Sequence, residues 1–223
     1  NKSGSLIVTA SWDHTCKVWN SFTGELLYDF DRNNFHNINL AIFTDTEHPR
    51  VITATNEGKA EVWSLANGKL LFELKSYVPQ VENINFSSGG EKILTRTLHA
   101  TYIWDNAKPT NLALWDASGN FRASIFSPDG KKIITTSADT IVRMYDAETG
   151  KVLKEMKGHT DAITDLVYSL DGKYIVTSSF DGTVRLWNSE SGKTVRILHG
   201  HTDYIYSIRF NLDGTKIITA SLD

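Results

Sequence analysis

The chain has little of several features that would assign it to a familiar class. Its one cysteine, Cys16, excludes an internal disulfide framework and fits a reducing compartment. No apolar run approaches the roughly 20 residues that span a bilayer, and no secretory leader follows Asn1. The formal net charge of −3 gives no general attraction to nucleic acid or acidic lipid. We therefore expect a cytoplasmic protein that neither binds nucleic acid nor inserts into a membrane. Because the first residue is not Met, we also expect the native N-terminus to lie upstream.

Motifs of nucleotide and zinc chemistry are also missing. The patterns GxxxxGK[ST], GxGxxG and HExxH do not occur. His199 and His201, one residue apart, could chelate a metal, but no Cys or carboxylate cluster completes a set of four ligands. We predict no cofactor, no metal and no small-molecule substrate.

What the chain does contain is a repeat of about 42 residues. Asp-Gly pairs recur in steps of 42, at Asp129-Gly130, Asp171-Gly172 and Asp213-Gly214. A second acidic turn recurs with the same step, at Asp139, Asp181 and Asp223. An aromatic residue recurs at steps of 44, 41, 41 and 42, at Trp19, Trp63, Trp104, Tyr145 and Trp187. Self-similarity at this period indicates one supersecondary unit that is used repeatedly.

Residues 158–198 show what one unit is. Four short segments rich in β-branched and aromatic residues alternate in polarity, as where Tyr174 and Val176 alternate with Ile175 and Thr177. Asp-Gly and Ser-Gly pairs separate the segments and suit tight turns. The pattern predicts a four-stranded antiparallel meander without any helix.

Such a sheet cannot bury two apolar faces alone, but sheets packed radially can, and this arrangement is a β-propeller. Gly158-His159, Asp181 and Trp187-Asn188 resemble the Gly-His, turn-Asp and Trp-Asp marks of WD-repeat proteins. Gly200-His201 and Asp223 repeat them, with 22 residues from His to Asp in both copies. The resemblance covers essentially the whole chain and implies an all-β propeller fold.

The repeat also predicts the domain organisation. We expect a partial blade over 1–30, blades over 36–74, 77–116, 121–156 and 157–198, and a partial blade over 199–223. Both ends supply the second strand of a blade, so we expect an arc of about five and a half blades from a ring of seven or more. A five-bladed ring with a spare strand is the alternative. The unit over 77–116 departs most from the pattern, with Gly89-Gly90 for Asp-Gly and His99 for the turn Asp.

His159, Ser179 and Asp181 could be taken for a Ser-His-Asp catalytic triad. The same set recurs 42 residues later, however, and an enzyme needs one such site. The resemblance instead implies that the histidine bridges the turn Asp and a strand hydroxyl, Ser179 or Thr177, with the tryptophan behind. We predict a non-catalytic protein in which these groups form a structural polar brace, comprising His159, Ser179, Asp181, Trp187, His201, Ser221 and Asp223.

By the same resemblance, one rim carries the residue before each turn Asp and the first residues after Gly-His. Several of these are large and apolar, and aromatic anchors ringed by polar groups are typical of protein-binding hot spots. The predicted protein-binding residues are Trp12, Asn56, Tyr77, Leu98, Ala138, Asp161, Phe180, Asp203, Tyr204 and Leu222.

These observations predict a scaffold that docks partner proteins or peptides on the propeller rim and holds a complex together. The alternative is a sensor or regulatory propeller in a larger multidomain signalling protein with an NTPase, kinase or protease. Regular repeats with TGK or SGK turns resemble arrays attached to such domains.

Overall fold

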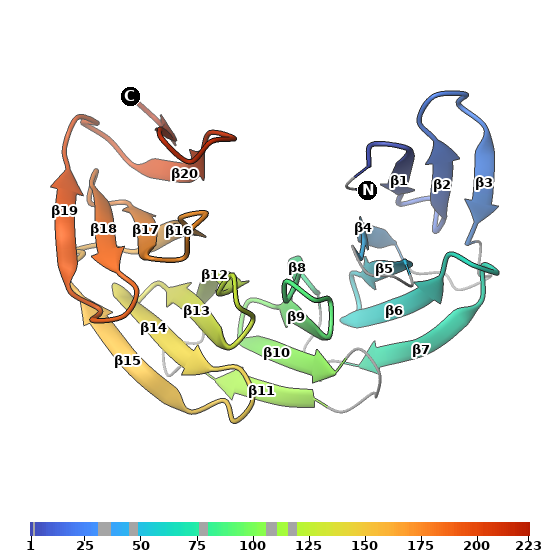
Figure 1. The fold of residues 1–223 in the computed structure, drawn as a ribbon, viewed down its shortest axis with the longest axis horizontal. Coiled ribbons are helices and arrows are strands. Elements are labelled where there is room, and N and C mark those ends of the chain that lie inside the picture. Colours follow the sequence, from blue (N-terminus) through green and yellow to red (C-terminus); the bar gives the residue numbers. More distant parts are fainter. Residues whose placement is uncertain (2, 31–36, 45–48, 76–79, 106–110, 116–119) are drawn as a thin grey trace. The chain divides into compact units, whose positions relative to one another are not determined.

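The structure is a computed structural model of the chain. It describes residues 1, 3–30, 37–44, 49–75, 80–105, 111–115 and 120–223. In these ranges every regular element is a β-strand, which confirms the predicted all-β fold (Figure 1). The same ranges hold no helix with the length and apolar character needed to cross a membrane.

The chain divides into two compact units, which we describe separately: residues 1–98 with 102–111, and residues 99–101 with 112–223. The first unit begins with a three-stranded sheet of β1 (Leu6–Ala10), β2 (Cys16–Asn20) and β3 (Leu26–Asp29). The next sheet contains β4 (Ile38–Phe43), β5 (Arg50–Thr55), β6 (Lys59–Ser64) and β7 (Leu70–Lys75). A further sheet has the order β11-β10-β9-β8, with β8 (Asn83–Phe86), β9 (Lys92–Arg96), β10 (Ala100–Asp105) and β11 (Asn111–Trp115), of which residues 100–101 and 112–115 belong to the second unit.

The second unit contains three more sheets in chain order. The first has strands β12 (Phe121–Phe126), β13 (Lys132–Ser137), β14 (Ile141–Asp146) and β15 (Val152–Lys157). The second has β16 (Ile163–Tyr168), β17 (Tyr174–Ser179), β18 (Val184–Asn188) and β19 (Thr194–Leu198). The last has two strands, β20 (Ile205–Phe210) and β21 (Ile217–Ser221). The predicted four-stranded antiparallel meander is therefore confirmed.

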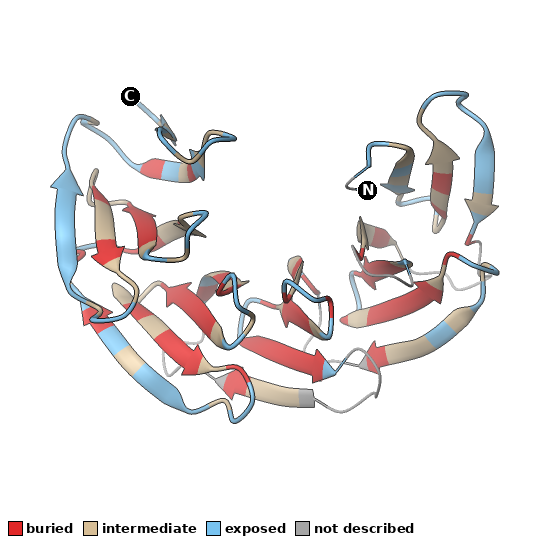
Figure 2. Ribbon diagram, in the orientation of Figure 1, coloured by how far each residue is buried: buried red, intermediate tan, exposed pale blue. Residues whose placement is uncertain are grey.

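The strands of one sheet differ greatly in burial. In β17, Ile175 and Val176 point to opposite faces and both are fully buried, since a neighbouring sheet covers each face. The fourth strand β19 is exposed along its whole length, and Figure 2 shows the same contrast between β13 and β19. Polarity alternation therefore describes these inner strands poorly, because their two faces are both interior.

The core of each unit lies between successive sheets. In the second unit, Met144 and Met156 from one sheet pack with Ile163 and Trp187 from the next. In the first unit, Val18 from β2 packs with Trp63 from β6. Each fully buried side chain of this size contributes roughly 1.5–3 kcal/mol through removal of apolar surface from water. The predicted mutual burial of adjacent sheets is what stabilises the fold.

Glycines allow adjacent sheets to approach at the turn between their third and fourth strands. Gly150 has a φ of +67°, and a Cβ atom there would lie 2.6 Å from Leu112 Cδ2 on β11. Gly192 has a φ of +72°, and its Cβ atom would lie 3.2 Å from Met156 Cγ on β15. Both the backbone conformation and the close approach therefore favour glycine here.

Candidate functional site

A chain of hydrogen bonds crosses the sheet β16–β19. Trp187 Nε1 lies 2.9 Å from Thr177 Oγ1, and Thr177 Oγ1 lies 2.8 Å from His159 Nε2. His159 Nδ1 in turn lies 2.7 Å from Asp181 Oδ2. The carboxylate also accepts hydrogen bonds from Thr160 N at 3.0 Å and Thr183 N at 2.9 Å. The series ties the loop before β16 to the turn between β17 and β18.

A neutral imidazole fits this series of hydrogen bonds. The indole N–H donates to Thr177, whose hydroxyl then donates to His159 Nε2, and Nδ1–H donates to Asp181. Every hydrogen is used once when the imidazole is neutral. Burial lowers the pKa of His159, although the hydrogen bond and charge of Asp181 act in the opposite direction. Burial raises the pKa of Asp181, but the hydrogen bonds that it accepts lower it more, so it stays a carboxylate.

The arrangement recurs in the two-stranded sheet. His201 Nδ1 lies 2.8 Å from Asp223 Oδ1, and His201 Nε2 lies 2.7 Å from Thr219 Oγ1. The hydrogen bond that Thr202 N donates lowers the pKa of Asp223 to about 2, with a further contribution from His201. This copy is more exposed to solvent than the first.

The strand hydroxyl that contacts each histidine is the threonine and not the serine. Ser179 Oγ donates to Asp161 O at 2.9 Å and accepts from Asp181 N at 3.1 Å. Ser221 Oγ likewise contacts Asp203 O at 3.2 Å. Of the two hydroxyls left open as the partner of His159, Ser179 or Thr177, the structure shows Thr177, and Ser179 and Ser221 are each held in their own turn. The set also lacks the serine–histidine contact that a nucleophilic triad requires.

One part of this network extends to other sheets, and sequence reasoning missed it. In three further sheets an indole N–H donates to a threonine hydroxyl on the neighbouring strand. The pairs are Trp19–Thr9 at 3.0 Å, Trp63–Thr53 at 3.2 Å and Trp104–Thr95 at 2.8 Å. The signal was present as a threonine nine or ten residues before each tryptophan. The tryptophan–threonine bond therefore occurs in more of the described sheets than the histidine–aspartate bond does.

The sheet β12–β15 uses different groups. Tyr145 stands where the other sheets have tryptophan, and Thr135 Oγ1 is buried without a hydrogen-bond partner among the described residues. The turn carboxylate Asp139 is held instead by Arg143, whose Nη2 lies 2.5 Å from Asp139 Oδ2. The Arg143 Nε atom also lies 3.3 Å from Glu155 Oε1. An ion pair thus replaces the histidine in stabilising this turn.

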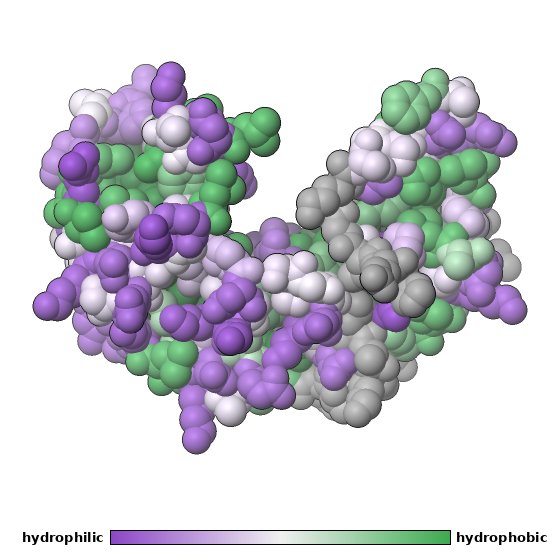
Figure 3. Space-filling model, in the orientation of Figure 1, coloured by the Kyte–Doolittle hydropathy of each residue, from purple (hydrophilic) through white to green (hydrophobic). Residues whose placement is uncertain are grey.

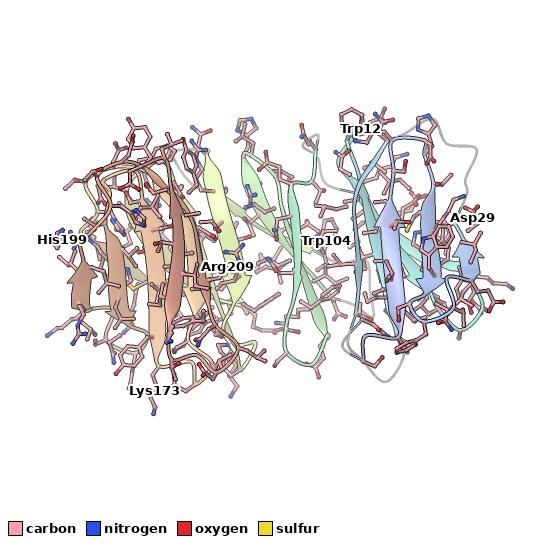
Figure 4. The ribbon with its side chains drawn as sticks, turned by 90° about the horizontal axis from the view of Figure 1, so that it is seen from above. Trp12, Asp29, Trp104, Lys173, His199 and Arg209 are labelled. Carbon is pink, nitrogen blue, oxygen red and sulfur yellow. The ribbon has the colours of Figure 1, made fainter. Side chains whose placement is uncertain are left out.

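The predicted rim residues of the first unit lie at strand ends. Trp12, in the turn between β1 and β2, is 75% exposed, and Figure 4 shows it beyond the end of these strands. Leu98 is 42% exposed in the corresponding turn after β9, and Asn56 is exposed in the turn after β5. Tyr77 lies outside the described residues.

In the second unit the structure brings several rim residues together. The rings of Phe180 and Tyr204 have centroids 4.6 Å apart, and Tyr206 meets Phe180 edge-on at 5.4 Å. The guanidinium of Arg122 lies 6.0 Å from the centroid of the Phe180 ring. Asp161, Asp203 and Leu222 are exposed near these turns, whereas Ala138 is half-buried.

Arg122 and Tyr206 were not predicted as rim residues. They occupy the same place in β12 and β20, since they are two 42-residue steps apart and each is the second residue of its strand. The signal that could have found them is their position, since each is an exposed residue at the rim end of the first strand of its sheet. The prediction considered only the loops.

The described residues of the second unit also line an open cavity. An open cavity of about 320 Å³ lies beside β18–β20 and is lined by Val184, Leu198, Ile205 and Ile217 among others. On the face drawn in Figure 3, apolar side chains gather over this part of the second unit. Within the described part of the chain, no group of three or more His, Cys, Asp or Glu side chains could hold a metal ion.

Several proteins of known name are similar to this chain. Autophagy-related protein 16 of Arabidopsis thaliana is 27% identical over 168 residues, which are 74% of this chain and 32% of that protein. Cilia- and flagella-associated protein 52 of Homo sapiens is 28% identical over 161 residues, 70% of this chain and 26% of that protein. Eukaryotic translation initiation factor 3 subunit I of Candida glabrata is 26% identical over 198 residues, 75% of this chain and 54% of that protein. The chain therefore spans about a third or less of the first two relatives.

The model of the WD40 family, described as WD domain, G-beta repeat, matches residues 1–20, 110–146, 150–188 and 192–223. These ranges make up more than half of the chain. They include both histidine-containing braces and the Arg122, Phe180 and Tyr204 side chains. WD40 proteins are generally non-catalytic and act as protein-interaction scaffolds. The chain belongs to the WD40 family.

Proposed function

We propose that this chain is a non-catalytic scaffold that docks partner proteins or peptides on its rim and holds them within a complex. The observation that carries the proposal is the exposure of large apolar side chains at turns that the sheets hold rigidly. Trp12 is 75% exposed and Leu222 62% exposed, and Phe180 lies against the exposed ring of Tyr204. A turn with only a structural role does not need side chains of this kind.

The polar brace supports the same proposal. Asp181 accepts four hydrogen bonds, from the Thr183 amide and hydroxyl in its own turn and from His159 and the Thr160 amide in the loop before β16. Phe180, the residue before it, is therefore held in a defined backbone position. Preorganisation of this kind lowers the conformational entropy lost when a partner binds.

The proposal also follows from what the buried polar groups do. His159, Thr177 and Asp181 use their hydrogen bonds on one another and on neighbouring groups, and the His159 side chain is fully buried. A general base must reach a substrate proton. The roles of these groups in the sheet therefore support a scaffold and not an enzyme.

Partner capture with matched variants tests the proposal. We expect a reproducible set of proteins, recovered from cell extract and measured by quantitative mass spectrometry, to decrease with Trp12→Ala or Phe180→Ala. Phe22→Ala is the control, because Phe22 is 82% exposed in the turn at the other end of β2. Equal recovery with all three variants would contradict a binding role for the rim.

The regulatory alternative, a propeller that restrains a catalytic domain of a larger signalling protein, stays a prediction. The full reading frame decides it, since it requires an NTPase, kinase or protease motif in the same protein. The predicted cytoplasmic location has a separate test, which is imaging of the full-length protein in cells.

A further inference from the structure

Four side chains of the second unit form one surface, which we call the Arg122 cluster: Arg122, Phe180, Tyr204 and Tyr206. They come from three successive sheets, with Arg122 on β12, Phe180 directly after β17, Tyr204 directly before β20 and Tyr206 on β20. Tyr204 is 43% exposed and Tyr206 48% exposed, although both rings contact Phe180. The cluster therefore presents aromatic surface that no part of the described chain covers.

Arg122 is the charged group of this surface. Its guanidinium is exposed and lies over the Phe180 ring, 6.0 Å from the centroid. Arg96, Arg143 and Arg209 each pair with a carboxylate, at Glu82, Asp139 and Asp165. No carboxylate of the described residues lies within ion-pair distance of Arg122. The ring holds the side chain in place while its hydrogen-bond donors remain available.

Two carboxylates occupy nearby turns but are engaged with their own backbone. Asp161 Oδ1 accepts a hydrogen bond from Ala162 N at 2.6 Å, and Asp203 Oδ1 accepts one from Tyr204 N at 2.7 Å. Their negative charge disfavours an anion beside them, which restricts the position of an incoming carboxylate to the guanidinium.

We propose that the Arg122 cluster binds a partner segment that carries an Asp or Glu next to an aliphatic or aromatic residue. The carboxylate accepts two hydrogen bonds from the planar guanidinium, a geometry that arginine favours. The neighbouring apolar side chain packs on Tyr204 and Tyr206, which supply large contact area with little conformational freedom to lose. This inference rests on the proposed docking function and specifies the chemistry of the partner.

Selection of short random peptides displayed on phage tests this specificity. We expect peptides selected by the wild-type chain to share an acidic residue within two positions of Leu, Ile, Phe or Trp. Selection by Arg122→Glu is expected to exchange the acidic residue for Lys or Arg. Arg196→Glu is the control, because Arg196 is also exposed, on the outer strand β19, and undergoes the same charge change.

Affinity measurements with a selected acidic peptide give the size of the Arg122 contribution to binding. Loss of the charge-assisted pair in Arg122→Ala is expected to weaken binding about tenfold or more. Arg196→Ala should leave the dissociation constant unchanged. Tyr206→Ala should also weaken binding, and thermal unfolding verifies that each variant is folded.

The outcomes separate this inference from the general function. A consensus without acidic residues, or acidic peptides that bind Arg122→Ala as tightly as wild type, would overturn the carboxylate assignment. If such peptides still lose affinity for the Phe180→Ala variant, the proposal of rim docking would stand although the carboxylate assignment fails. If no selected peptide depends on any of these residues, the present inference fails, and rim docking is then decided by the recovery of partners with Trp12→Ala and Phe180→Ala.

Discussion

Two neighbouring sheets of the second unit, β12–β15 and β16–β19, have the same topology and a 42-residue offset but stabilise their turns differently. In β16–β19 an indole, a hydroxyl and an imidazole connect in series to the turn carboxylate. In β12–β15 the carboxylate pairs with Arg143, and the hydroxyl of Thr135 is left without a partner. The turn carboxylate is common to both, and the group that holds it is not.

This difference shows which substitutions the fold accommodates. Tyr145 fills the place of a tryptophan and is 3% exposed, so the apolar packing is preserved. The indole N–H is lost with the substitution, and the threonine that would receive it becomes a buried polar group without a bond. Such a group costs about 1–3 kcal/mol relative to a satisfied one.

The largest effect is expected from removing the central hydroxyl of the series. Thr177→Val should lower the free energy of unfolding by about 2–3 kcal/mol, because both the indole of Trp187 and Nε2 of His159 lose a buried partner. Thr135→Val, the same change in the neighbouring sheet, should be neutral or stabilise by up to about 1 kcal/mol. Urea unfolding measures both. A similar loss in the two variants would show that Thr135 is also satisfied.

An intermediate effect is expected at the close contact between two sheets. Gly150→Ala should destabilise the chain by about 2 kcal/mol, since it adds left-handed backbone strain and a Cβ atom 2.6 Å from Leu112 Cδ2. Gly24→Ala has a similar φ of +73° with open space around it, so it should show only the backbone cost of about 1 kcal/mol. Thermal unfolding of the two variants gives the contribution of the contact. Equal losses would indicate that Leu112 moves aside freely.

The smallest effect is expected from pH. The folded state lowers the pKa of His159 below its usual 6.5, so as the pH falls through 6.5 the unfolded chain binds more protons than the folded one. The contribution of His159 to the free energy of unfolding should therefore be fully present above pH 6.5 and decrease below it. His159→Gln should show a weaker dependence of the free energy of unfolding on pH between about 7.5 and 5.5, measured by urea unfolding. The lowered pKa of Asp139 keeps the turn carboxylate of the neighbouring sheet ionised over this range. A dependence as steep as that of wild type would assign the titration to another group.

The repeat made much of the fold predictable from sequence. A 42-residue period with turn residues in phase identifies the sheets and their strand order, since each strand must follow its turn. It did not determine which of Thr177 and Ser179 contacts the histidine, because the two residues are two positions apart on β17 and their side chains point to the same face. That choice depends on the position of the His159 ring.

The rim was predicted only in part. Phe180 and Tyr204 were expected from the turn positions, whereas Arg122 and Tyr206 lie on strands that belong to different sheets. Their proximity depends on how the sheets stack, which a one-dimensional pattern does not contain.

The brace has a consequence for how such a surface can evolve. Asp181 and its donors secure the backbone of the turn without using the side chain of Phe180. Substitutions at that position therefore leave the hydrogen bonds of the turn intact. A duplicated copy of the chain could acquire a new binding partner by changing these few side chains while it keeps an unaltered framework.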